Sequence, residues 1–155
     1  MTTLLWLTEG TWEACVDAAR ALSLADVTVL HVLDDALIAG WAGGGAGLLG
    51  RGRSPAGPGP LLDAEAALLD AAVDRLGTPV RRETRRGRVE REVVAAAAGI
   101  DLLVCARDGD RRYPGPHSLG PATRFVVDHA PCAVLLVWPR AAPTGATSLA
   151  LAGES

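Results

Sequence analysis

The sequence has no lysine, and all fifteen of its basic residues are arginine. Together with many alanines, glycines and prolines, this composition is typical of a GC-rich genome rather than of a particular function. The formal net charge of −3 argues against broad binding to nucleic acid. The one local exception is an arginine cluster at residues 81–91. Glu83, Glu90 and Glu92 partly neutralise this cluster, so a solvated face is favoured over an RNA-binding one.

Long hydrophobic runs are also missing, since no apolar stretch approaches the ~20 residues that a bilayer span requires. The first residues show no basic segment followed by an apolar core and a cleavage site, which argues against secretion. We therefore expect a cytoplasmic protein without membrane or nucleic-acid partners.

Cysteine is scarce and odd in number, with Cys15, Cys105 and Cys132 far apart and in apolar surroundings. No Cys-x-x-Cys pair or His-Cys cluster is present, so neither a disulfide framework nor a zinc site is indicated. The pattern predicts buried, reduced thiols and no metal site.

The chain has 155 residues, of which 49% are apolar and 21% charged, as expected for a single globular domain. Residues 3–8 form a short apolar run that predicts a buried strand, and Thr11 is placed to cap a helix that continues to Leu22. Residues 27–33 are rich in β-branched side chains and predict a second buried strand. Strand, helix and strand in this order predict a βαβ unit with parallel strands.

Residues 39–60 interrupt this pattern with nine glycines and three prolines, which predicts a flexible surface loop. Further along, the pattern predicts helices at 63–76, 88–98 and 120–129, with Gly99 ending the second of these. The same pattern predicts strands at 79–84, 101–106 and 133–138, the first of them a polar strand at a sheet edge. The small residues of 140–155 predict a disordered tail.

Five strands alternate with four helices in this prediction, so we expect an α/β domain over residues 1–139 with a doubly wound, five-stranded parallel sheet. Ligands of such sheets bind beyond the carboxyl ends of the strands, where the strand order reverses. The loops after the first and fourth strands should flank that crevice.

Several segments resemble the universal stress protein family. Residues 120–137 (GPATRFVVDHAPCAVLLV) are similar to its closing helix and strand, and residues 100–109 (IDLLVCARDG) to its fourth strand and the start of its glycine loop. The runs LLWLTEGTWEA and TVLHVLDD are similar to its first two strands. This resemblance covers residues 2–139. It implies an adenine nucleotide alpha hydrolase-like fold with strand order 3-2-1-4-5 and the last strand at the sheet edge.

In ATP-binding members of that family the loop reads Gly, two residues, Gly, nine residues, Gly, then Ser or Thr. Its glycines let backbone N–H groups approach phosphate, and the following helix adds positive potential. Here Ala106 replaces the first glycine, Gly109 keeps the second, and Gly120 follows after ten residues instead of nine. Pro121 replaces the Ser or Thr and has no N–H to donate. The lost contacts are worth ~1.5–3 kcal/mol each.

The resemblance also assigns provisional roles beyond the glycine loop. Glu9 aligns with an acidic residue that contacts the nucleoside, and Val32 aligns with a position near adenine, with ordinary core packing an equal alternative. Core packing is favoured over base stacking for Trp12. For the arginines of the loop, solvated charges are favoured over phosphate contacts; these residues are Arg107, Arg111 and Arg112. The full provisional nucleotide set is Thr8, Glu9, Val32, Cys105, Ala106, Gly109, Gly120, Pro121, Ala122 and Thr123.

No catalytic constellation accompanies this motif, because Ser118 and Thr123 lie outside any Gly-x-Ser-x-Gly elbow. We expect a non-enzymatic stress-response protein without strong ATP binding, acting as a homodimer through residues 133–138 or through another protein partner. The alternative is a stress protein that retains weak ATP or AMP binding. A hydrolase or transferase on the same scaffold is a distant third.

Overall fold

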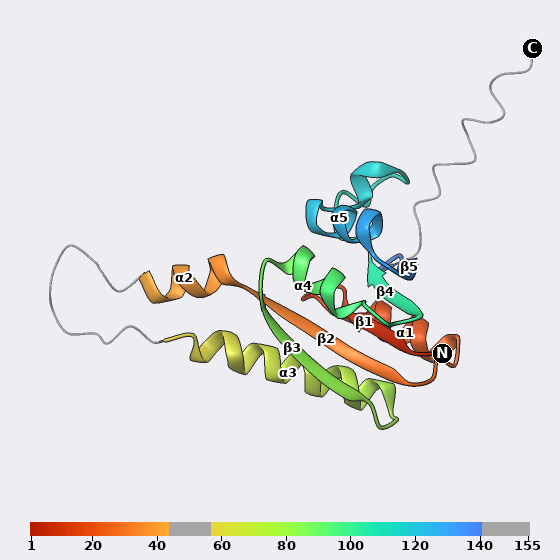
Figure 1. Ribbon diagram of the computed structural model, residues 1–155, viewed down its shortest axis with the longest axis horizontal. Coiled ribbons are helices and arrows are strands. Elements are labelled where there is room, and N and C mark those ends of the chain that lie inside the picture. Colours follow the sequence, from red (N-terminus) through yellow and green to blue (C-terminus); the bar gives the residue numbers. More distant parts are fainter. Residues whose placement is uncertain (44–56, 141–155) are drawn as a thin grey trace, which may run out of the picture.

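The computed structural model describes residues 1–43 and 57–140, and Figure 1 shows the arrangement of their helices and strands. Strands and helices alternate along most of the chain. In order they are β1 (Thr3–Trp6), α1 (Trp12–Ala21), β2 (Val27–Asp34), α2 (Asp35–Gly43), α3 (Gly59–Leu76), β3 (Arg81–Gly87), α4 (Val89–Ala96), β4 (Leu102–Ala106), a 3₁₀ turn (Pro116–Ser118), α5 (Pro121–His129) and β5 (Ala133–Val137).

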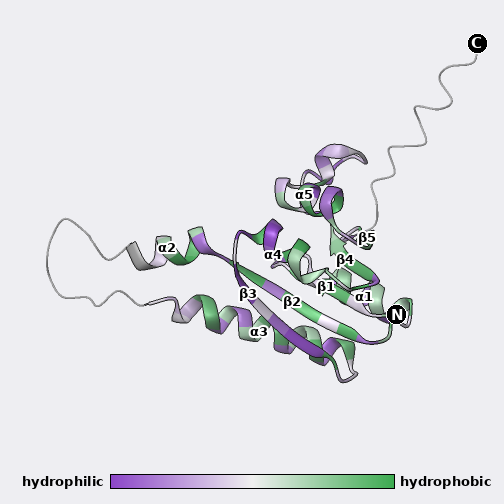
Figure 2. Cartoon of the chain, in the orientation of Figure 1, coloured by the Kyte–Doolittle hydropathy of each residue, from purple (hydrophilic) through white to green (hydrophobic). Residues whose placement is uncertain are grey.

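The five strands form one sheet in the order β3-β2-β1-β4-β5, and every neighbouring pair is parallel. This is the predicted topology, with β3 and β5 at the two edges. The outer strand β3 carries charged side chains along most of its length, and it is strongly hydrophilic in Figure 2. Such a strand suits a sheet edge, because charges discourage pairing with other chains.

Helices cover both faces of the sheet and create two apolar layers (Figure 1). On one face α1 and α3 pack against each other and against the sheet, around a buried cluster that includes Val16, Leu69 and Val104. On the other face α4 and α5 enclose a second cluster, which includes Leu4, Val93 and Val126. The two layers follow from side-chain alternation, because successive residues of a strand point to opposite faces.

The first layer contains a buried polar pair that the sequence pattern does not predict. Nδ1 of His31 on β2 lies 2.5 Å from Oε2 of Glu65 on α3, and the two residues are only 9% and 7% exposed. Each side chain satisfies the other where water has little access. The pair therefore fixes α3 against the middle of β2.

The structure has five α-helices over its described residues, so the predicted number of four was wrong. The additional helix, α2, begins directly after β2 and includes the start of the predicted loop at 39–60. Asp34 supports this start, because its carboxylate accepts a 2.8 Å hydrogen bond from the N–H of Ala36. Leu37 and Trp41 on α2 are exposed. The glycines at 40 and 43 did not prevent this helix, because its first turn, capped by Asp34, lies before them.

The remaining boundaries agree with the prediction to within a few residues. Helix α3 begins at Gly59 instead of 63, because Pro60 is compatible with a first helical turn. Residues 44–56 of the predicted loop and 141–155 of the predicted tail lie outside the described residues. Across residues 1–43 and 57–140, no helix is both long enough and apolar enough to cross a bilayer.

Candidate functional site

The strand order reverses between β1 and β4, which are paired in the centre of the sheet. The segment after β1 begins near Thr8, and the segment after β4 runs from Arg107 to Gly120. Both segments leave the carboxyl ends of their strands, so they flank the crevice in which doubly wound sheets bind ligands. This is where the sequence predicted the site.

The segment after β1 is a tight turn that leads into α1. The carbonyl oxygen of Thr8 accepts hydrogen bonds from the N–H groups of Thr11 and Trp12, and Gly10 adopts a positive φ of 80°. The hydroxyl groups of Thr8 and Thr11 lie 2.7 Å apart and bond to each other. Thr11 is the N-cap residue of α1, as predicted, but its side chain bonds to Thr8 and to no N–H of the helix. Glu9 is exposed at the turn.

Four of the provisional nucleotide residues, Val32, Cys105, Ala106 and Thr123, are buried, and the first three belong to the apolar layers. Val32 and Cys105 belong to the apolar layer under α4 and α5, whereas Ala106 belongs to the opposite layer under α1 and α3. Burial raises the pKa of the Cys105 thiol to about 12. Trp12 packs against the α1–α3 layer, in agreement with its favoured interpretation as a core residue.

The start of α5 is occupied by a carboxylate of the chain itself. Asp108 Oδ1 accepts a 2.7 Å hydrogen bond from the N–H of Gly120, and Oδ2 accepts a 2.8 Å bond from the hydroxyl of Thr123. Pro121, the next residue, has no N–H to offer. Anions bind at helix N-termini through such donors, and here Asp108 already uses them.

The role of Asp108 is not evident from the sequence, although the glycine loop around it is. Capping residues are found from sequence by their position next to a helix. Asp108 lies 12 residues before Gly120 and reaches it only because the intervening segment folds back. The only sequence signal was an acidic residue inside the glycine loop.

The segment between Gly109 and Ser118 folds back on itself through its backbone. The N–H of Gly109 donates to the carbonyl oxygen of Ser118 over 2.9 Å, and that of Asp110 donates to His117 over 2.7 Å. A Cβ atom at Gly109 would collide with the carbonyl oxygen of His117. Gly109 is therefore required for the closed shape of this segment, whether or not a ligand is bound.

The three arginines of the segment lie in different surroundings. Arg107 donates to the hydroxyl of Ser118 over 2.5 Å, and its guanidinium lies 4.6 Å from the ring centroid of Trp138. Arg112 is paired with Asp110, which holds the pKa of that carboxyl at about 2. Arg111 lines a separate cleft at the end of β5. They do not converge on the start of α5.

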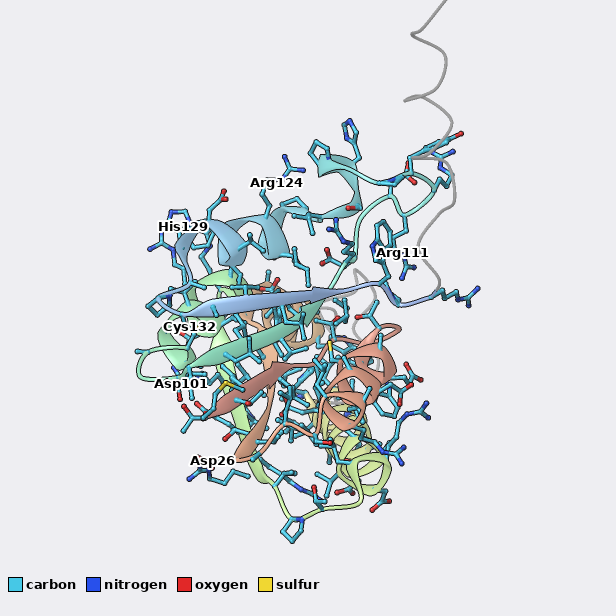
Figure 3. The ribbon with its side chains drawn as sticks, turned by 90° about the vertical axis from the view of Figure 1, so that its right-hand side faces the viewer. Asp26, Asp101, Arg111, Arg124, His129 and Cys132 are labelled. Carbon is cyan, nitrogen blue, oxygen red and sulfur yellow. The ribbon has the colours of Figure 1, made fainter. Side chains whose placement is uncertain are left out.

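The side chains of Ser118, Thr123 and His129 are bonded to neighbouring groups of the chain, and His129 lies at the end of α5 away from Gly120 (Figure 3). The Ser118 hydroxyl donates to the carbonyl oxygen of Gly115, and Nδ1 of His129 bonds to that of Phe125. The Thr123 hydroxyl is held by Asp108. Within 1–43 and 57–140, no group of three or more His, Cys, Asp or Glu residues is arranged to hold a metal ion.

Most of the arginine cluster on β3 and α4 is neutralised by ion pairs. Arg81 pairs with Asp26, Arg82 pairs with Asp70, and Arg85 pairs with Glu83. Arg88 likewise pairs with Glu90. These pairs agree with the interpretation of the cluster as a solvated face.

The fold and the crevice define a doubly wound α/β protein of the kind that binds ligands at its topological switch point. The profile of the Universal stress protein family matches residues 11–137, so the chain belongs to this family. No curated protein gave a significant match to the sequence.

Solved structures show the same fold. The universal stress protein UspA from Lactobacillus plantarum is 25% identical with a TM-score of 0.56, over 88% of this chain and 97% of that one. A universal stress protein in complex with cAMP is 19% identical with a TM-score of 0.60, over 90% and 98% of the two chains. A family member from Arabidopsis thaliana with AMP bound is 15% identical with a TM-score of 0.53, over 96% and 99%.

Proposed function

We propose that this protein is a non-catalytic stress-response regulator that does not depend on tight ATP binding. The observation that carries the proposal is the Asp108 carboxylate at the start of α5. An ATP phosphate at the same place would have to displace Asp108 or lie beside it. Both arrangements are unfavourable, because the phosphate and the Asp108 carboxylate would compete for the same few hydrogen-bond donors.

The neighbouring residues weaken phosphate binding further. Pro121 withholds one N–H, and the hydroxyl of Thr123 is already used by Asp108. Ala106 turns its methyl group into the core, where it packs rather than contacts the crevice. Gly109 and Gly120 are kept, but both are explained by the folding of the segment and by close contact with Asp108.

Calorimetric titration with Mg-ATP tests this proposal. The wild-type protein should show a dissociation constant no tighter than about 100 μM, which corresponds to roughly −5.5 kcal/mol. The double variant Asp108→Ala, Pro121→Ser should bind at least tenfold more tightly, because it removes the internal anion and restores a donor. Asp128→Ala is the matched control, since it removes one negative charge from the exposed part of α5 and should leave the affinity unchanged.

Two results would contradict the proposal. Low-micromolar binding by the wild-type protein would mean that Asp108 does not exclude phosphate. Equal affinities of the wild-type protein and the double variant would mean that some other feature limits binding.

Weak binding of an adenine nucleotide is the second candidate function. It is supported by the relatives whose structures contain cAMP and AMP, and by the exposed carboxylate of Glu9 beside the crevice. A dissociation constant between about 100 μM and 10 mM for AMP would favour this candidate.

We further propose that the protein acts as a homodimer through β5. Within residues 1–43 and 57–140 this strand pairs with β4 alone, and its residues are half-buried or exposed, whereas those of β1 are all buried. An apolar edge strand has unpaired backbone groups that favour pairing with another strand. A second copy, antiparallel across a two-fold axis, would satisfy them and cover Leu135 and Val137.

Light scattering should then report about twice the chain mass of 16.0 kDa. Leu136→Pro should shift the mass toward the monomer, because proline removes a backbone donor and disturbs the edge. Leu136→Ala keeps the N–H and should remain dimeric, and circular dichroism establishes that both variants are folded. A wild-type monomer at high micromolar concentration would overturn the dimer proposal.

A further inference from the structure

A second concave surface lies at the carboxyl end of β5. It is an open cleft of about 320 Å³, and its described lining residues are Arg111, Trp138, Pro139 and Arg140. Figure 3 shows Arg111 beside the end of this strand. None of these residues belongs to the provisional nucleotide set. We call this surface the Trp138 cleft.

No acid of the described residues forms an ion pair with the two arginines of the Trp138 cleft. Over the described residues, neither Arg111 nor Arg140 forms an ion pair, whereas Arg75, Arg81, Arg82, Arg85, Arg88 and Arg112 all do. The two acids of the adjacent segment are already engaged. Asp110 is held by the guanidinium of Arg112, and Asp108 is held by Gly120 and Thr123.

The indole of Trp138 gives the cleft a fixed wall. The guanidinium of Arg107 stacks on the Trp138 ring and is anchored by Ser118, which is itself fully buried. Ser118 is tied in turn to the carbonyl oxygen of Gly115. Pro139 follows the tryptophan and restricts the backbone at that point. A preformed wall lowers the entropic cost of binding.

We propose that the Trp138 cleft binds a phosphate monoester. Arg111 and Arg140 contact the phosphoryl group, since planar guanidinium groups bind phosphate oxygens in pairs. The organic group lies along the Trp138 wall. The volume of this open cleft lies at the lower end of the ~300–1,000 Å³ typical of small-molecule sites, which leaves room for more than an inorganic ion.

Titrations of the full-length protein with phenyl phosphate and with inorganic phosphate test this assignment. The indole N–H resonance of Trp138, identified by its loss in Trp138→Phe, should shift in a saturable manner with phenyl phosphate. Inorganic phosphate should bind at least fivefold more weakly, because it lacks the organic group. Arg111→Ala and Arg140→Ala should each weaken phenyl phosphate binding at least fivefold.

Arg112→Ala is the matched control, because Arg112 belongs to the same segment but is already paired with Asp110. It should leave the affinity for phenyl phosphate unchanged. The proposal is overturned if Arg112→Ala weakens binding as much as Arg111→Ala, or if no saturable shift occurs at 10 mM phenyl phosphate. Asp108→Ala should not weaken binding at this cleft, so the outcome is independent of whether the crevice binds ATP.

Discussion

At the scale of single residues, Asp108 shows how a side chain can change the binding properties of a helix terminus without changing the fold. The helix α5 offers a Gly120 N–H and a Thr123 hydroxyl, which are the kinds of donor that hold an anion. The carboxylate of Asp108 is already part of the chain, so it binds these donors without losing translational freedom. A free anion loses its translational and rotational freedom when it binds, which makes its binding less favourable.

The buried pair of His31 and Glu65 gives a prediction at the same scale. Glu65→Ala should lower the free energy of unfolding by about 3 kcal/mol, because His31 loses its partner and a cavity forms between β2 and α3. Urea denaturation measures the loss. Glu65→Gln keeps an oxygen acceptor and should cost only about 1 kcal/mol. Equal losses for both variants would show that the contact has no specific role.

At the scale of elements, helix ends are set by backbone geometry as well as by side chains. Helix α3 ends at Leu76 and is capped by Gly77, whose φ of 69° lies in the left-handed region and whose N–H donates to the carbonyl oxygen of Val73. This geometry allows the chain to leave the helix and enter β3. Helix α2, in contrast, begins where the Asp34 carboxylate binds a backbone N–H.

Gly77→Ala should therefore destabilise the protein by about 1–2 kcal/mol, because a Cβ atom is strained in the left-handed region. The measurement is the shift in the urea midpoint at constant slope. Gly59→Ala is the matched control. It lies at the first position of the same helix with open space around it and without a positive φ, so the change should be within 0.5 kcal/mol. A comparable loss in the control would contradict the strain argument.

At the scale of the whole molecule, one sheet is shared by two apolar layers. Cys15 lies in the layer with α1 and α3, and Cys105 lies in the layer with α4 and α5. Burial raises the pKa of both thiols to about 12. Cys132 is only half-buried. The reactivity of each thiol therefore measures how accessible one of the two layers or the surface is to solvent.

Iodoacetamide at pH 8 should modify Cys132 first in the native protein, and Cys15 and Cys105 only when urea unfolds it. The two buried thiols should react at the same rate, because both layers depend on the same sheet. Mass spectrometry of tryptic peptides measures each site, and Cys132→Ser supplies the control. Different rates for Cys15 and Cys105 would mean that the layers open separately.

The same thiols determine how stability changes in alkaline solution. Their folded-state pKa of about 12 lies above the ordinary value of 9.0, so the unfolded chain loses these protons first as the pH rises. The stabilisation is present below about pH 9 and is lost between about pH 9 and 12. Urea denaturation at a series of pH values should show this decrease, and Cys15→Ala should reduce it.

The sequence by itself determined the sheet and most of its helices. Strands such as β2 and β4 are short, apolar and bounded by turn residues, and α1 carries its apolar residues at helical spacing. These are local patterns, so they can be recognised without knowing the fold. The additional helix α2 was not predicted, because the many glycines of residues 39–60 indicate a loop more strongly than the short apolar run after Asp34 indicates a helix.

Only the tertiary structure decided what lies at the start of α5. The contact between Asp108 and Gly120 depends on a segment that folds back through its own backbone, and the pairing of His31 with Glu65 joins residues 34 apart. The same is true of the different surroundings of Arg107, Arg111 and Arg112. Local propensity and spacing cannot reveal such contacts, because they depend on which distant segments the completed sheet brings together.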